Sequence, residues 1–348
     1  MCPTGSHQPH NREEQHIAHA VETAYFADRP AWHGRGVTVE GARTWRAAME
    51  IADALWEVEK HPAYALVPVI TADGVSNHYV PMDGRYAVTR TLRDGSVRVL
   101  GDVGEQWTPF QNVEAGEFLD TLVDAGELRF ESVLVLHGGR VIVLLARTPN
   151  DLVIGDGDRV CPYIGLVNSH DGSMALSVRE FQTRIVCANT LAVGLRERTP
   201  NVWKVRHTGN LRERLEEARR TLKLHTTYNQ AWAEEMHRLL DQPFSQADYA
   251  GMVKELFPVD RRRDRKREDP NVDRRAVMLA NYHRTRTVSP AMLATKYGAF
   301  NVATEALEHL QKVRGRKGYD KGEVRLIGSL FGQIADQRQQ VYAYLIRN

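Results

Sequence analysis

The polar segment at residues 168–173 stands between two apolar stretches and carries the residue types of an acid–base site. His170 would act as the base, Asp171 would orient it, and Cys187 or Ser173 would be the nucleophile, since a nucleophile needs a base within hydrogen-bond reach. Such a site would suit a nuclease-like or modifying enzyme. The same residues also fit a plain hairpin turn, because Asp171-Gly172 is a favourable turn pair. No nucleophile elbow accompanies them, so catalysis stands as an alternative reading.

A second group of residues has the chemistry of a polyanion site. Basic and aromatic residues alternate over residues 179–206, and a further basic run covers residues 261–267. Cationic side chains can follow a phosphate backbone, and an aromatic ring can stack on an unpaired base. Taken singly, Phe181 and Trp203 are more typical of core residues than of stacking platforms. The residues expected to contact nucleic acid are Arg179, Arg184, Arg196, Arg198, Trp203, Lys204, Arg206, Arg261, Arg262, Arg263, Arg265, Lys266 and Arg267.

The sequence contains no motif that is typical of a metal site or a cofactor site. The sequence has no HExxH, CxxC or paired-carboxylate signature and neither GxGxxG nor GxxxxGK[ST], so we expect no metal and no cofactor. Three cysteines, Cys2, Cys161 and Cys187, are an odd number without metal-site spacing, which favours a reducing cytoplasm. The apolar runs are far shorter than the roughly 20 residues of a membrane span, and the first residues do not resemble a secretory signal. We expect no membrane contact and a cytoplasmic location.

Charge is unevenly distributed along the chain. Residues 1–175 hold 14 Lys and Arg against 24 Asp and Glu, whereas residues 176–348 hold 32 against 20, although the whole chain has a net charge of only +2. A basic half of this kind can mark a surface for a polyanion. It can equally reflect solvated helix faces or pairing with the acidic half.

The elements that must position these residues follow from apolar periodicity. Helical spacing with Thr44 as a cap predicts a helix over residues 43–59, and Thr108 with Pro109 predicts a second helix to about residue 125. Period-two segments bounded by Asp-Gly or Gly-Gly pairs predict strands. These cover residues 64–69, 77–82, 85–91, 97–100, 129–136, 141–147, 163–168 and 174–181.

Helical spacing dominates the second half of the chain. It begins near Leu211, includes a helix capped by Ser245, and continues with a helix over residues 290–311 opened by Ser289 and a last helix over residues 321–346. The order of elements predicts an α+β fold, with an antiparallel β meander and packed helices in the first half and a helical C-terminal half. We expect a disordered tail at residues 1–20, an α+β core domain at 21–200 and a basic helical region at 201–348.

Several longer strings resemble a known family. They are the segments at residues 100–109 (LGDVGEQWTP), 111–120 (QNVEAGEFLD), 168–173 (NSHDGS), 184–191 (RIVCANTL) and 297–305 (YGAFNVATE). Together they are similar to the phage/plasmid-like protein family, catalogued as domain of unknown function 932. Departures such as Ala188 and Val302-Ala303 are modest. The resemblance implies mobile-element DNA metabolism, and the order of elements is similar in outline to Rad52- and RecT-type single-strand annealing proteins.

These observations favour a non-enzymatic DNA-binding protein of phage or plasmid origin. It would bind single-stranded DNA, with duplex DNA as an alternative, and promote annealing during recombination or replication, as a ring or filament of identical subunits. One alternative is an enzyme that uses His170, Asp171 and Cys187. The other is a counter-defence or structural factor that binds a host protein.

Overall fold

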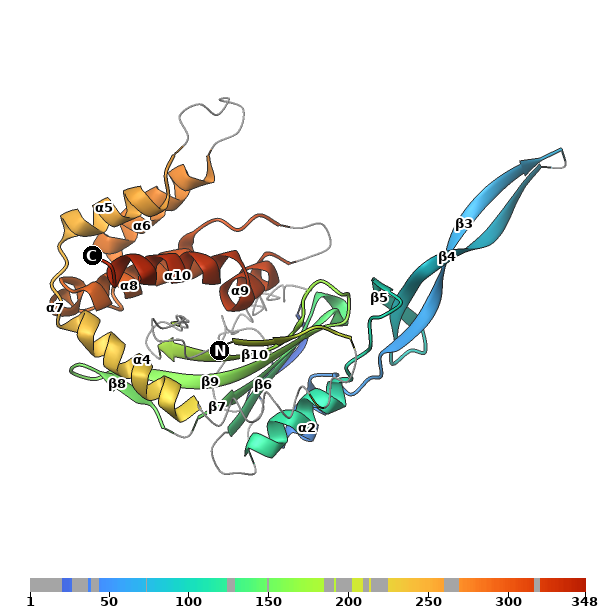
Figure 1. Ribbon diagram of the computed structural model, residues 1–348, viewed down its shortest axis with the longest axis horizontal. Helices are drawn as coiled ribbons and strands as arrows, with labels where there is room; N and C mark the ends of the chain where they lie inside the picture. The colour runs from blue at the N-terminus through green and yellow to red at the C-terminus, as the bar shows by residue number, and fades with distance from the viewer. Residues whose placement is uncertain are drawn as a thin grey trace, which may run out of the picture.

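The computed structural model describes residues 21–26, 37–38, 44–72, 74–123, 129–148, 150–184, 191, 202–208, 213, 225–259, 269–315 and 320–348. The tail expected at residues 1–20 lies wholly outside these residues. The first part of the helical region expected to begin near Leu211 lies largely outside them. Over the described chain the fold is α+β, with antiparallel sheets in the first half and helices in the second, as predicted (Figure 1).

The main sheet contains eight strands of the described chain, in the order β11-β10-β9-β7-β6-β1-β2, with β8 paired to β9. All neighbours are antiparallel except β1 and β2, which run parallel. The hairpin of β6 and β7 has the predicted boundaries, because Gly138 at φ +70° and Gly139 at φ +90° make the tight connection. The strands are β1 (Val21–Phe26), β2 (Val37–Thr38), β6 (Arg129–Leu136), β7 (Val141–Arg147), β8 (Leu152–Ile154), β9 (Asp158–Ser169), β10 (Leu176–Arg184) and β11 (Val202–Val205).

Helices cover both faces of this sheet. Alternate side chains of β6, β7, β9 and β10 pack against α1 (Trp45–Ile51) and α2 (Asn112–Val123) on one face. The side chains between them point to the other face, where Leu326 and Leu330 of α9 (Lys321–Phe331) complete the core. A sheet that is buried on both faces reads as a continuous apolar run, which is why β7 has the sequence VIVLLAR.

Both helices on the first face begin or end differently from expectation. Thr44 caps α1 as predicted, but the helix ends at Ile51 rather than residue 59, because Asp53 has φ +49° and the backbone of Val58 pairs with the Gln111 side chain. The predicted Thr108 cap of α2 is wrong. The backbone of Thr108 instead bonds to His207, and the helix starts only at Asn112.

A second sheet, in the order β3-β4-β5, projects from the body (Figure 1). It consists of β3 (Glu59–Thr71), β4 (Gly74–Thr91) and β5 (Val97–Gly104). The break expected at Asp83-Gly84 is not a turn, because β4 runs through it with a register shift opposite residues 62–64 and with Gly84 at φ +68°. Val58, Val88, Leu100 and Val103 form a small core at the base of this sheet.

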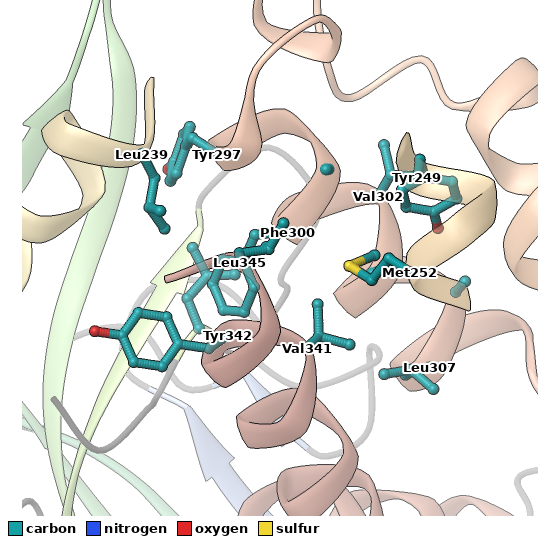
Figure 2. Packing of buried hydrophobic residues seen from close by; sticks show 14 of the residues in the cluster. Leu239, Tyr249, Met252, Tyr297, Phe300, Val302, Leu307, Val341, Tyr342 and Leu345 are labelled. Carbon is teal, nitrogen blue, oxygen red and sulfur yellow. The ribbon is translucent and has the colours of Figure 1, made fainter. Parts of the chain in front are cut away.

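The second half is a helical layer with its own core (Figure 2). Trp232, Tyr249, Phe300 and Tyr342 are buried there. The helix expected over residues 290–311 is divided, because Ser289 caps α7 and Thr295 caps α8 separately, and the one expected over 321–346 breaks at Gly332. The elements are α4 (His225–Leu240), α5 (Gln246–Leu256), α6 (Pro270–Arg284), α7 (Pro290–Leu293), α8 (Lys296–Glu305), the π-helical turn η2 (Ala306–Leu310), α9 and α10 (Gln333–Leu345).

None of the helices in the described part of the chain has the length and apolar character needed to cross a bilayer.

Candidate functional site

His170 lies at the end of β9 and is wholly buried. Its Nε2 donates to Asn112 Oδ1 at 2.8 Å, its backbone N–H donates to the Arg140 carbonyl at 2.7 Å, and the Trp56 ring packs edge-on against it at 5.2 Å. These contacts join α2, β9 and the segment that leads into β3. They position the imidazole as part of the core.

Burial decides the charge of this histidine. Loss of hydration lowers the pKa of His170 to about 3, and the nearby His207 lowers it further. Asp171 raises the pKa in part, and Arg90 has the smallest effect, a lowering one. His170 is therefore neutral at physiological pH. His207, buried and stacked on Trp107 at 5.2 Å, also has a lowered pKa because of burial.

The arrangement differs from the acid–base site that the sequence suggested. Asp171 does not orient His170; its Oδ1 accepts from Ser169 Oγ at 2.6 Å and from the Ser173 backbone N–H at 2.9 Å, and so closes the turn. Asn112 takes the orienting role. Cys187 lies outside the described residues, so its distance from His170 is not defined.

A cavity of about 340 Å³ lies beside Trp56, the residue whose ring contacts His170. Trp56 and Arg90 line it, with the Arg90 guanidinium 4.7 Å from the centre of the Trp56 ring. The Trp56 ring also contacts the His170 ring in a T-shaped arrangement. His170 itself does not line the cavity and has no exposed surface through which a substrate could reach it.

Of the residues predicted to contact nucleic acid, four have side chains that the structure describes. These four differ in burial and do not form one surface. Arg179 on β10 is turned inward, where its Nη1 donates to the Leu330 carbonyl at 2.5 Å and burial lowers its pKa to about 10. Trp203 on β11 is half-buried against the main core. Lys204 and Arg206 are exposed beside it.

The other predicted contacts lie outside the part of the chain that the structure describes. Of Arg184 only the backbone is placed, at the end of β10. The remaining residues of the prediction are Arg196, Arg198, Arg261, Arg262, Arg263, Arg265, Lys266 and Arg267.

A second cavity, of about 460 Å³, lies in the basic half between α6, residues 311–314, α9 and the start of α10. Arg274, Lys312 and Arg314 supply cationic groups to its lining, while Val313, Val324, Ile327 and Ile334 supply apolar walls. Arg274 is held by Gln311 Oε1 at 3.1 Å and by Asn271, and Lys312 Nζ lies 2.8 Å from Asp273. Burial lowers the pKa of Arg274.

Two basic stretches lie close in the sequence to residues that line this basic cavity. The run at residues 261–267 precedes Pro270, which lines the cavity, and Arg316 and Lys317 follow shortly after Arg314. The first stretch is among the residues predicted from the sequence to contact nucleic acid, whereas Arg274, Lys312 and Arg314 are not. The string RGRKG at residues 314–318 is a basic, glycine-containing signal that could have indicated the second.

The described residues contain no group of three His, Cys, Asp or Glu side chains arranged to hold a metal ion. Cys161, which is buried among the described residues, has its pKa raised to about 12 by burial and by the adjacent Asp151. At neutral pH this thiol is protonated, so it is a poor nucleophile.

Comparison with known proteins assigns the chain to a sequence family. Curated proteins and solved structures gave no significant match. Residues 99–331 match the family described as "Domain of unknown function (DUF932)", and this segment is more than half of the chain. It includes the His170 turn, His207 and most of the residues that line the basic cavity, but not Gln333 and Ile334. The chain therefore belongs to the DUF932 family.

Proposed function

We propose that this protein binds single-stranded DNA and promotes the pairing of complementary strands, with the basic cavity as part of its DNA-binding surface. The observation that carries the proposal is the combination of Arg274, Lys312 and Arg314 with apolar walls in one cavity of about 460 Å³. Cations recognise phosphates, and apolar walls suit a base that is not paired. A cavity of this size falls within the usual range for small ligands, about 300–1,000 Å³.

The apolar lining of the cavity favours single strands over duplex. In a duplex the bases are stacked and paired, so placing one in a cavity costs a few kcal/mol, whereas a single strand offers its bases at lower cost. Lys204 on β11 and Arg206 directly after it add exposed positive charge at the edge of the main sheet in the described chain. The basic runs at residues 261–267 and 314–317 add charge close to the cavity in the sequence.

The biological context belongs to the same proposal. Annealing by a DNA-binding protein of a phage or plasmid, in the manner of Rad52- and RecT-type proteins, would take place in the cytoplasm of a bacterial host. Such proteins pair strands by holding single strands along rings or filaments of identical subunits. Segregation of charge between an acidic and a basic half supports contacts between subunits.

Anisotropy of a fluorescently labelled oligonucleotide, single-stranded or duplex, tests the proposal together with an annealing assay on the same preparation. The informative variant is Lys312→Ala with Arg314→Ala, since both residues line the cavity and are exposed. We expect at least tenfold weaker single-strand binding, because two charge-assisted contacts are lost.

Arg238→Ala is the matched control. Arg238 is an exposed arginine of the same helical half, on α4, whose ion pair with Glu235 is at the surface and contributes little to stability. The control should bind like the wild type. Equal loss in both variants would reject the cavity as a DNA site, and an absence of binding to either DNA form at low salt would reject the proposed function.

A further inference from the structure

The outer part of the β3–β4 hairpin extends beyond the support of any third described strand. Residues 64–71 of β3 pair with residues 74–81 of β4, while β5 pairs only with residues 85–91 at the base. The hairpin projects from the body as an arm (Figure 1). A two-stranded ribbon is marginally stable in water unless its apolar side chains are covered.

One face of the arm is apolar along its length. Residues directly opposite each other on antiparallel strands share a face, so the pairing register defines it. We call this the arm face: Tyr64, Leu66, Pro68, Ile70, Val75, Asn77, Tyr79 and Pro81. Five of its large side chains expose more than half of their surface, from 54% for Tyr64 to 84% for Ile70. The opposite face is mixed: its apolar residues are smaller and less exposed, namely Ala65, Val67, Val69 and Val80, and the polar residues Thr71, Ser76 and His78 lie among them.

Charge excludes a nucleic acid as the occupant of the arm face. Residues 64–82 contain no lysine and no arginine, and Asp73 is the only acidic residue in this range of the sequence. A surface that binds phosphates needs cations to neutralise them. An uncharged apolar face instead fits another apolar protein surface, and two copies of it meet without opposing like charges.

Prolines argue against pairing through the strand edges. Pro68 on β3 and Pro81 on β4 have no backbone N–H to donate to an added strand, and prolines are a common protection of exposed sheet edges. The arm can still pack by its face. Face-to-face packing of two ribbons buries the apolar side chains of both, as in a β-sandwich.

We propose that the arm face is a homodimer interface, in which the arms of two copies of this chain pack face to face. The five exposed side chains amount to about 600 Å² of apolar area per copy, given roughly 150–250 Å² for a whole aromatic side chain. This reaches the upper end for the largest apolar patch on a monomer, about 300–600 Å². Two copies would bury about 1,200 Å², which meets the lower limit for a specific interface. An isologous contact uses the same patch twice, so it requires only that the patch be self-complementary.

Sedimentation velocity over a hundredfold concentration series tests the proposal on the full chain, freed of nucleic acid so that DNA cannot bridge two copies. The wild type should shift from one chain to two as the concentration rises. Leu66→Lys places a charge at the centre of the arm face and should raise the dimer dissociation constant at least tenfold. Val67→Lys makes the same change one residue along, on the opposite face, and should raise it less than threefold.

A mixture of Leu66→Lys and Leu66→Glu chains adds a positive test, because opposite charges on the two arm faces should restore association that each variant lacks alone. Unchanged thermal unfolding of the variants confirms that the body is intact. A wild type that sediments as a single chain throughout, or equal effects of Leu66→Lys and Val67→Lys, would overturn the proposal. Neither result depends on DNA binding, so the arm and the basic cavity are tested separately.

Discussion

Lowering the pH from about 7 to about 5 should destabilise the protein through His170. In the folded chain its pKa is lowered to about 3, mainly by burial, while in the unfolded chain it has an ordinary value of about 6.5. As the pH falls, the unfolded chain binds this proton first. The stabilisation from the neutral imidazole is therefore fully present above about pH 6.5 and is lost progressively as the pH approaches the folded pKa.

The size of the effect follows from the two pKa values. Each pH unit below the unfolded pKa costs about 1.4 kcal/mol for one proton, so His170 alone should remove about 2 kcal/mol of unfolding free energy between pH 7 and pH 5. His170→Gln isolates this contribution, because glutamine does not titrate and its amide can still donate to Asn112 Oδ1. Carboxyl groups and His207 titrate in both proteins and cancel in the difference.

Urea unfolding of wild type and His170→Gln at both pH values measures the effect. We expect the variant to be less stable at pH 7, where the edge contact with Trp56 is lost, and the difference between the two proteins to shrink by about 2 kcal/mol at pH 5. A difference that stays constant within about 0.5 kcal/mol would refute a neutral, buried His170. The enzyme reading of this residue requires in addition that His170→Ala abolish an activity while the fold is intact.

Further predictions concern the helical half. Arg338→Met should lower the unfolding free energy by about 3–5 kcal/mol, because it leaves the buried Glu308 without the guanidinium that lies 2.8 Å away. In urea unfolding, the double variant Arg338→Met with Glu308→Leu should recover most of this loss. Equal losses in the single and double variants would contradict that explanation. Gly298→Ala should destabilise the protein by about 2 kcal/mol or more, since its methyl group would lie 1.9 Å from the Met292 carbonyl oxygen. The control is Gly251→Ala on α5, whose methyl group meets nothing within 4 Å. In thermal unfolding this control should be neutral or stabilising by up to about 1 kcal/mol. A Gly298→Ala protein as stable as the wild type would show that α7 and α8 can separate there.

Local signals in the sequence identified much of the fold. The β6–β7 hairpin has its predicted ends because its strands are apolar throughout and its connection is Gly-Gly. Ser245 caps α5 as predicted, in a reciprocal bond with Asp248 only three residues along the chain. Features of this kind depend on neighbours in sequence, so their spacing is visible without a structure.

The misplaced boundaries depend on partners distant in sequence. Thr108 is of a residue type that caps helices, but its backbone is hydrogen-bonded to His207, 99 residues away. Arg179 has the character of a phosphate ligand, but alternation along β10 turns it toward α9, where it meets the Leu330 carbonyl 151 residues away. In the basic cavity Arg274 comes from α6, whereas Lys312 and Arg314 come from a segment far along the chain, so no local motif brings Arg274 together with the other two.

The salt dependence of single-strand binding tests the central claim most directly. For contacts with Z phosphates, the logarithm of the binding constant should fall against the logarithm of salt concentration with a slope of about −0.7Z for single strands. If Arg274, Lys312 and Arg314 each contact a phosphate, the slope should be about −2 or steeper, should become shallower when Lys312 and Arg314 are replaced by alanine, and should accompany a preference for single strands over duplex. A flat response, or no binding at low salt, would contradict DNA binding by this protein.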